Sequence, residues 1–361
     1  MTPAAETPSS RPYSLYLVRI PVIFECVADA LLNEFGAISR KRLGQDYHLI
    51  NATEPRAIRW SEAAKFVRWN LPMDHAWPCH PAKMERFIEK AARTLARKFS
   101  ERAPQGIFIG QLNPGSPDKY YKSLASNLRG RTLQLFPHLK AAAVEEQDPE
   151  LETLFCLVGK EGLFCGMQSP RDSNGWYPGG SKFIGVESPE TISRAGAKIA
   201  EALHCLTLYR PPLPAGAHWL ELGASPGGMT SELLRRGQRV TAVDRAPLDR
   251  RLDNLPGLTF IQCDVAAFTP EERNAAVFDA ILCDLNGPPE ESIGHVIRLS
   301  ELLKKPGLIL FTLKLPRVEN LKEPCELFRK TAETARAAGL RLFAQTHLTH
   351  NRHEFTLFFE G

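Results

Sequence analysis

The chain has 361 residues, of which 43% are hydrophobic and 24% charged, and its formal net charge is +4. These values predict an ordinary soluble globular protein with room for two or three domains. They speak against a membrane protein, because no apolar run approaches the length that spans a bilayer.

The N-terminal residues and the cysteines both favour a cytoplasmic location. Residues 1–12 are polar and proline-rich, lack the apolar core of a signal peptide, and are predicted to form a disordered tail. Eight cysteines are scattered singly, with no CxxC pair. This spacing predicts free thiols rather than a zinc site or a disulfide framework, so we expect no metal.

The charge is distributed unevenly. Residues 83–140 hold twelve Lys or Arg against four Asp or Glu, whereas the rest of the chain is mildly acidic. A basic region of this kind suggests contact with a polyanion, although a solvated helix face explains it equally well. The charge alone leaves both interpretations open.

The first half of the chain mixes short strands and helices. An apolar stripe with helical spacing runs through residues 80–102, from Met84 to Phe99. The other elements expected are a strand at 14–20, a helix to about 35, a strand at 47–52, a strand at 106–112, a helix from 119 and a hairpin at 154–167. Together they predict a small α+β substrate-binding region.

The second half alternates regularly. After a loop at 168–180 and a helix at 190–206, strands are expected at 218–224, 239–244, 258–264, 276–285 and 307–315, with helices at 228–236, 290–304 and 321–338. Such alternation predicts an α/β fold with a mostly parallel, doubly wound sheet. The last two strands, 340–348 and 353–360, leave no room for a helix between them, so the sheet should end in an antiparallel hairpin.

A glycine-rich turn follows the first of these strands. Turns of this type bind NAD, FAD or S-adenosylmethionine, but the spacing here fits neither GxGxxG nor a P-loop. An acid, Glu221, precedes Gly-x-x-x-Gly-Gly, which matches the first motif of Rossmann-like methyltransferases. We therefore predict an S-adenosylmethionine site that contains Glu221, Gly223, Ala224, Ser225, Pro226, Gly227, Gly228 and Met229.

Two further acids end the next strands. Asp244 could accept hydrogen bonds from the ribose hydroxyls of the cofactor, and Asp264 could accept one from the adenine amino group. The alternative for both is an ordinary role in capping a helix or forming a turn.

The reaction is indicated by residues far from this turn. The segment 283–289, Cys-Asp-Leu-Asn-Gly-Pro-Pro, lacks the aromatic residue of methyltransferases that act on base amines, and Cys283 is poorly placed for a cytosine-C5 nucleophile. Lys314 interrupts an apolar strand near its carboxyl end, where a lysine is costly unless it is paired or functional. Lys198, Asp284 and Glu354 are the other polar residues that stand out in apolar surroundings.

In order and position, Lys198, Asp284, Lys314 and Glu354 resemble the Lys-Asp-Lys-Glu tetrad of the FtsJ-like RNA 2′-O-ribose methyltransferases. The segments that carry the resemblance are SRAGAK (193–198), LGASPGG (222–228), CDLNGPP (283–289), LKLP (313–316) and HNRHEFT (350–356). Among these enzymes the chain looks most like the bacterial 23S ribosomal RNA cytidine 2′-O-methyltransferases of the RlmM family.

The resemblance implies a domain organisation. It divides the chain into a ferredoxin-like α+β segment at 13–105, a THUMP-like RNA-binding region at 106–184 and an FtsJ-like catalytic domain at 185–361. The resemblance is strong over 185–361. It is weaker but collinear over 106–184, and over 13–105 it rests mainly on the opening strand and helix.

The resemblance also implies the chemistry. Lys198, Asp284, Lys314 and Glu354 would be the catalytic residues, Asp284 would also contact S-adenosylmethionine, and Lys314 would take or steer the proton of the 2′-hydroxyl during in-line methyl transfer. Lys198 would disfavour the charged form of Lys314 while the two carboxylates would favour it, and the sequence leaves the outcome open.

The expected substrate is RNA, with large-subunit ribosomal RNA first. Transfer RNA, or a non-catalytic RNA-binding or assembly factor with a vestigial fold, are the alternatives. Arg194, Arg317 and Arg352 flank the tetrad and could hold phosphates, or could equally be ordinary surface arginines. The oligomeric state stays open, and a monomer is compatible with the sequence.

Overall fold

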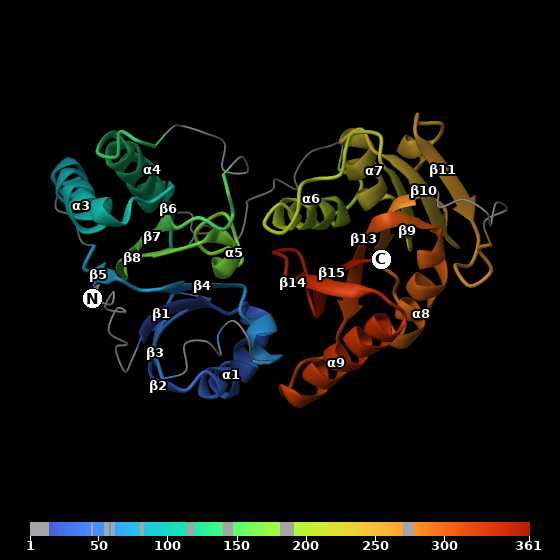
Figure 1. Cartoon of the computed structure of the whole chain (residues 1–361), viewed down its shortest axis with the longest axis horizontal. Coiled ribbons are helices and arrows are strands. Elements are labelled where there is room, and N and C mark those ends of the chain that lie inside the picture. Colours follow the sequence, from blue (N-terminus) through green and yellow to red (C-terminus); the bar gives the residue numbers. More distant parts are fainter. Residues whose placement is uncertain are drawn as a thin grey trace, which may run out of the picture.

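The structure is a computed structural model that describes residues 14–44, 46–53, 58, 62–79, 83–113, 119–139, 147–180, 191–269 and 278–361. Its strands form three sheets, which Figure 1 shows in two halves. We call the described residues up to 180 the N-terminal half and those from 191 the C-terminal half. No described helix has the length and apolar character needed to cross a membrane.

The first sheet is antiparallel and has the strand order β2-β3-β1-β4. Its strands are β1 (Ser14–Arg19), β2 (Ala37–Leu43), β3 (Tyr47–Ala52) and β4 (Trp69–Pro72). The predicted helix after β1 begins as a 3₁₀ turn at Val22–Val27 and continues as α1 (Ala28–Glu34). Strand β2 was not predicted, because as an exposed edge strand rich in charge it has no apolar alternation.

The second sheet has the order β5-β8-β7-β6 and carries two helices on one face. Its elements are β5 (His75–Trp77), α3 (Met84–Phe99), β6 (Gly106–Gln111), α4 (Lys119–Gln134), β7 (Thr153–Gly159) and β8 (Gly162–Gln168). The predicted hairpin is confirmed as β7–β8. Since β5 and α3 pack with β6–β8, this sheet crosses residue 105, and the division of the first half into units stays a prediction.

The third sheet confirms the predicted α/β class. Its order is β11-β10-β9-β12-β13-β15-β14, and all its pairs are parallel except those of β15. Its strands are β9 (His218–Leu222), β10 (Arg239–Asp244), β11 (Leu258–Gln262), β12 (Phe278–Cys283), β13 (Leu303–Lys314), β14 (Arg341–Thr346) and β15 (Glu354–Glu360).

Helices cover both faces of this sheet (Figure 1). One face carries α6 (Ala195–Leu206) and α7 (Gly228–Arg235), and the other carries α8 (Pro289–Leu299) and α9 (Lys322–Ala337). A short helix, α5 (Pro170–Ser173), lies within the segment expected to be a loop.

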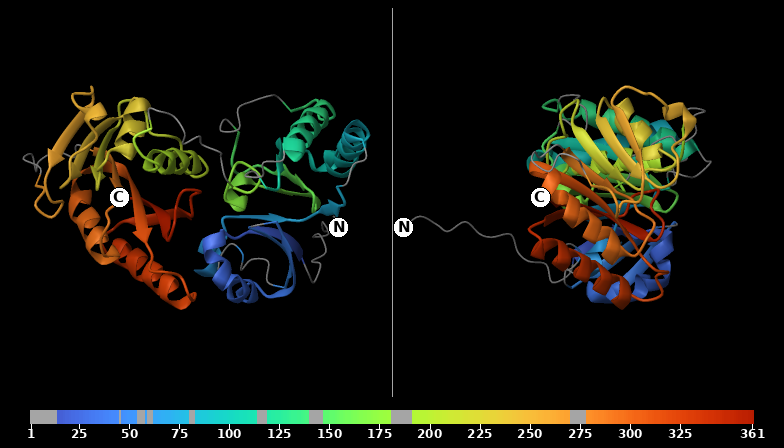
Figure 2. Two further views of the ribbon diagram at one scale, coloured as in Figure 1. Left: turned by 180° about the vertical axis from the view of Figure 1, so that it is seen from behind. Right: turned by 90° about the vertical axis from the view of Figure 1, so that its right-hand side faces the viewer.

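The two halves share hydrophobic cores. Phe24 and Phe66 of the N-terminal half are fully buried in the same cluster as Phe355 of β15. Burying a phenylalanine side chain stabilises a fold by roughly 2–3 kcal/mol, so these contacts hold the halves together. Lys65 of the N-terminal half lies 4.2 Å from the ring centroid of Phe328 on α9, and Figure 2 shows the helical part of the N-terminal half next to α9 when the molecule is seen from behind.

The strand order reverses between β9 and β12. Chain order runs outward from β9 through β10 to β11, and then continues on the other side with β12 and β13. Open α/β sheets bind their ligands at the carboxyl ends of the strands beside such a switch point. The fold therefore directs attention to the ends of β9 and β12.

Candidate active site

The glycine turn lies at this switch point, between β9 and α7. Gly223 and Gly227 have φ angles of 82° and 102°, which side chains rarely adopt. A Cβ atom at Gly223 would also lie 3.1 Å from the main-chain oxygen of Asp284. The turn therefore needs glycine both for its conformation and for its close approach to the end of β12.

The other predicted members of the turn are placed differently from one another. Ala224 and Met229 are buried in the hydrophobic core shared with α6. The main-chain N–H of Ser225 donates to Asp244 at 2.9 Å, and its hydroxyl donates to the main-chain oxygen of Pro247 at 2.9 Å. Asp244 is thereby tied to the turn, with further lone pairs on its carboxylate for a ligand.

Asp264 lies at the end of the edge strand β11. Its carboxylate accepts the main-chain N–H of Ala266 at 2.8 Å, which is a turn-forming contact, and is half exposed. Asp264, Asp244, the glycine turn and Asp284 follow one another across β11, β10, β9 and β12. Three strand spacings cover about 14 Å, which suits an extended nucleoside-like ligand.

Glu221 lies beneath the turn and is 2% exposed. Thr230 of α7 donates its hydroxyl to the Glu221 carboxyl at 2.7 Å. Burial raises the pKa of Glu221 to about 8, and the nearby Asp284 and Asp244 act in the same direction. The carboxyl is thus held protonated near neutral pH, and a cationic ligand beside it would favour its ionisation.

The four residues of the predicted tetrad meet at the carboxyl edge of the sheet. Lys314 Nζ lies 2.6 Å from Asp284 Oδ1 and 2.7 Å from Glu354 Oε2. Lys198 Nζ lies 3.2 Å from Asp284 Oδ2 and 2.6 Å from Glu354 Oε1. Each carboxylate thus bridges both lysines, and the four groups form a closed ring of alternating charge.

This ring decides the question about Lys314 that the sequence left open. Burial acts to lower the pKa of Lys314, but Asp284 and Glu354 outweigh burial and raise the pKa above its ordinary value. Lys314 is therefore an ammonium at neutral pH. It can donate hydrogen bonds and stabilise negative charge, and it can accept a proton only after losing its own.

Close helix packing brings Lys198 to the ring. A Cβ at Gly196, near the start of α6, would lie 2.9 Å from the main-chain oxygen of Gly228. A Cβ at Gly228 would lie 2.0 Å from the hydroxyl of Ser193. These two glycines let α6 approach the cofactor turn, so that Lys198 reaches over it to Asp284.

Two charged residues next to the site were missed. Arg68 and Glu201 are 3% and 2% exposed and form an ion pair between the two halves. Glu201 lies one helical turn after Lys198 on α6. The signal in the sequence was a charged residue within an apolar stretch in each case, the same signal that identified Lys314.

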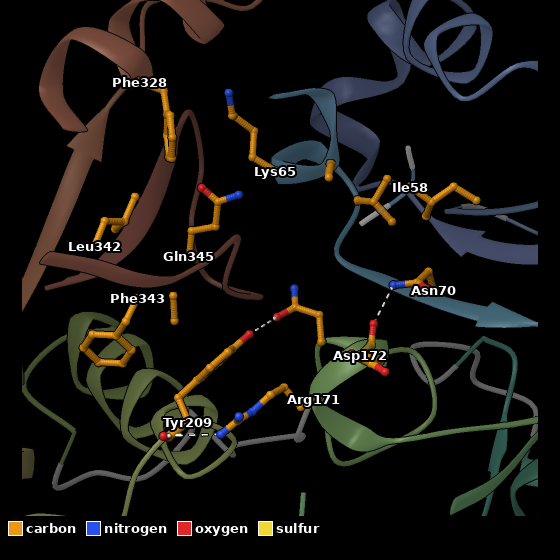
Figure 3. A pocket seen from close by; sticks show the side chains of 14 residues that line it. Ile58, Lys65, Asn70, Arg171, Asp172, Tyr209, Phe328, Leu342, Phe343 and Gln345 are labelled. Atoms are coloured by element: carbon orange, nitrogen blue, oxygen red, sulfur yellow. Dashed lines mark hydrogen bonds between the residues drawn. The ribbon is translucent and has the colours of Figure 1, made fainter. Parts of the chain in front are cut away.

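A cavity of about 520 Å³ lies at the boundary between the halves, beside β14 (Figure 3). None of the predicted site residues lines it. Several of its polar side chains bond to their neighbours, since Tyr209 donates to Asn174 and Asn70 donates to the main-chain oxygen of Asp172. The cavity is therefore separate from the tetrad.

A doubly wound sheet with a glycine turn at its switch point and a row of acids at its carboxyl edge is typical of the Rossmann-like proteins that hold a nucleoside cofactor, a class that includes the S-adenosylmethionine-dependent methyltransferases. The comparisons identify the family. The family model of the FtsJ-like methyltransferases matches residues 191–337. Residues 191–337 therefore form an FtsJ-like methyltransferase domain, and S-adenosylmethionine is its cofactor.

Bacterial relatives resemble more of the chain. It is 30% identical over 240 residues to a ribosomal RNA large subunit methyltransferase M of Halorhodospira halophila, covering 66% of each chain. It is 28% identical over 264 residues to the protein of the same name in Shewanella halifaxensis, covering 69% of this chain and 70% of the relative. The chain thus matches about two thirds of the length of these relatives.

Solved structures are more distant. Fibrillarin of Aeropyrum pernix with bound S-adenosyl-L-methionine is 17% identical, with a TM-score of 0.36 over 60% of this chain and 85% of that one. The family assignment therefore rests on the sequence relatives.

Replacing Gly227 with alanine should weaken S-adenosylmethionine binding about tenfold. The new Cβ would lie 2.2 Å from Cδ1 of the buried Leu252 at a φ of 102°, so the Leu252 side chain or the turn must shift and the backbone is strained. Isothermal titration calorimetry would measure the change in affinity. Gly237→Ala is the matched control, because Gly237 also has a positive φ but a Cβ there would have no atom within 4 Å. Equal losses of affinity in both variants would contradict a role for the turn itself.

Proposed function

We propose that this chain transfers a methyl group from S-adenosylmethionine to the 2′-hydroxyl of a ribose in RNA, and that its substrate is large-subunit ribosomal RNA. The closed ring of Lys198, Asp284, Lys314 and Glu354, beside the cofactor turn, carries the proposal. The names of the relatives support the choice of substrate.

The bound cofactor supplies an activated methyl group on a sulfonium, so the chain has to align the hydroxyl and manage its proton. Two of the three N–H groups of Lys314 are directed at Asp284 and Glu354. In this proposal the third N–H donates to the 2′-oxygen and stabilises negative charge as it develops. The proton of the hydroxyl passes to the ring, where the two carboxylates can accept it.

The cofactor is held, in this proposal, by residues on three neighbouring strands. The main chain of the turn from Gly223 to Gly228 holds the methionine part, Asp244 accepts from the ribose, and Asp264 accepts from the adenine amino group. The carboxyl of Glu221 supports the turn from below. Each assignment follows from the order of these residues across the sheet.

The RNA contact is proposed to involve the basic helices of the N-terminal half. Arg86, Lys90, Arg93 and Arg97 are all exposed on α3, at spacings that put them along one side of the helix. Such a row can follow phosphates. We also propose a division of the chain into segments 13–105, 106–184 and 185–361. The same proposal includes a cytoplasmic location and is compatible with a monomer.

The reaction can be tested in cells from which the gene has been deleted. Mass spectrometry of nuclease-digested ribosomal RNA should show the loss of one 2′-O-methylated nucleotide from the large-subunit RNA. Wild-type protein should restore it, and Lys314→Ala should not. Unchanged ribosomal RNA, together with loss of a ribose methyl from transfer RNA, would keep the chemistry and overturn the substrate.

A further inference from the structure

The ion pair between Arg68 and Glu201 is the most deeply buried charged contact between the described residues of the two halves. Arg68 precedes β4 in the N-terminal half, and its guanidinium contacts Glu201, the hydroxyl of Thr346 and the main-chain oxygen of Gly180. A buried pair of this kind stabilises less than a well-packed apolar contact would, because both charges lose their hydration. Stability therefore does not explain why this ion pair lies beside the active site, and we look for a role in the reaction.

Glu201 is connected both to Lys198 and to the segment that precedes Glu354. Glu201 lies three residues after Lys198 on α6, so the two side chains are neighbours on the helix surface. Its carboxylate also accepts the N–H of Thr349 at 2.7 Å and the hydroxyl of Thr349 at 2.9 Å. Thr349 belongs to the connection between β14 and β15 that leads to Glu354.

Aromatic packing holds the same connection from the other side. The ring of Phe24 lies 5.0 Å from that of His347, and the ring of Phe66 lies 5.4 Å from that of Phe355. Successive side chains of a strand point to opposite faces. Contact of Phe355 with the N-terminal half therefore directs Glu354, its neighbour, towards the face that carries α6 and Lys198.

We propose that Arg68 is a positioning residue of the active site, and that through Glu201 and Thr349 the N-terminal half holds Lys198 and Glu354 in the geometry that the reaction needs. The inference rests on the proposed function for the identity of the reaction. It assigns the N-terminal half a part in the chemical step in addition to any contact with RNA.

Arg68→Met tests this by separating rate from binding. Single-turnover methyl transfer at saturating cofactor and RNA, well below the melting temperature, should fall between about 10- and 100-fold, because small displacements of reacting groups have effects of this size. The dissociation constants for S-adenosylmethionine and RNA should stay near those of the wild type. Weaker RNA binding with an unchanged rate would overturn the proposal, since Arg68 would then act on the substrate.

A double variant separates positioning from stability. Arg68→Met with Glu201→Gln should recover much of the melting temperature, because no charge is then buried alone, but should keep the slow rate. Recovery of the rate together with the melting temperature would overturn the proposal.

Thr207→Val is the matched control. Thr207 lies at the end of α6 far from Lys198, and its hydroxyl accepts the indole N–H of Trp176 across the same boundary at 2.8 Å. The substitution removes this acceptor, and the rate of the variant should match that of the wild type.

A measurement without RNA distinguishes failure of this inference from failure of the proposed function. Acetic anhydride labelling, read by mass spectrometry, should modify Lys198 faster in Arg68→Met than in the wild type, relative to the exposed Lys304. Unchanged labelling would count against positioning whatever the substrate is. Faster labelling in a protein that methylates no RNA would overturn only the proposed function.

Discussion

Replacing Lys314 with alanine should lower the rate of methyl transfer about 10³-fold, within the range expected when a group that handles a proton is removed. The ammonium of Lys314 joins Asp284 to Glu354, and without it these two carboxylates would share only the ammonium of Lys198. Binding of S-adenosylmethionine should persist, because the glycine turn and Asp244 are untouched. Single-turnover transfer of a radiolabelled methyl group, with calorimetry for cofactor binding, would measure both effects.

Lys304 provides the control for this experiment. It lies on the same strand, β13, at the opposite end, and its ammonium pairs with Asp279 at 2.9 Å. Lys304→Ala therefore removes an ion-paired lysine from the strand without touching the tetrad, and should retain the wild-type rate. A normal turnover in Lys314→Ala would contradict the assignment of the tetrad.

Replacing Glu221 with glutamine should make the protein less sensitive to alkaline pH. The folded chain holds the pKa of Glu221 at about 8, against an ordinary value of 4.5. Between these two pH values the folded state keeps a proton on Glu221 that the unfolded chain releases. The contribution of Glu221 to the free energy of unfolding is therefore complete below pH 4.5 and is lost as pH rises to about 8. The difference corresponds to up to about 5 kcal/mol at alkaline pH.

Chemical denaturation at a series of pH values would measure this effect. Glu221→Gln and the wild type should have similar free energies of unfolding near pH 5, and the variant should be more stable above pH 8. Glu333→Gln is the control: Glu333 lies on α9, is half exposed and pairs with Arg329, so the same substitution there removes no buried carboxyl. Parallel stability curves for the wild type and Glu221→Gln would contradict a raised pKa.

The predictable parts of the fold are those governed by local pattern. The apolar run of β13 and the alternation of strands with helices identified the parallel sheet, because buried parallel strands need continuous apolar residues. The β7–β8 hairpin followed from two apolar runs separated by a short polar turn. Strand β2 was missed because it is exposed and rich in charge, although it pairs with the neighbouring β3. Strands β4 and β5 were missed because each is short and forms only by pairing with a strand distant in the sequence.

The residue types of the site and their order along the chain are predictable from the sequence: a glycine turn after Glu221, and Lys198, Asp284, Lys314 and Glu354 in positions that indicate one chemistry. The closed ring of the four, the charge on Lys314, the neutral state of Glu221 and the pairing of Arg68 with Glu201 are visible only in the folded chain. Protonation depends on burial and on neighbouring charges within a few ångströms. Those neighbours are supplied by strands and helices that lie far apart in the sequence.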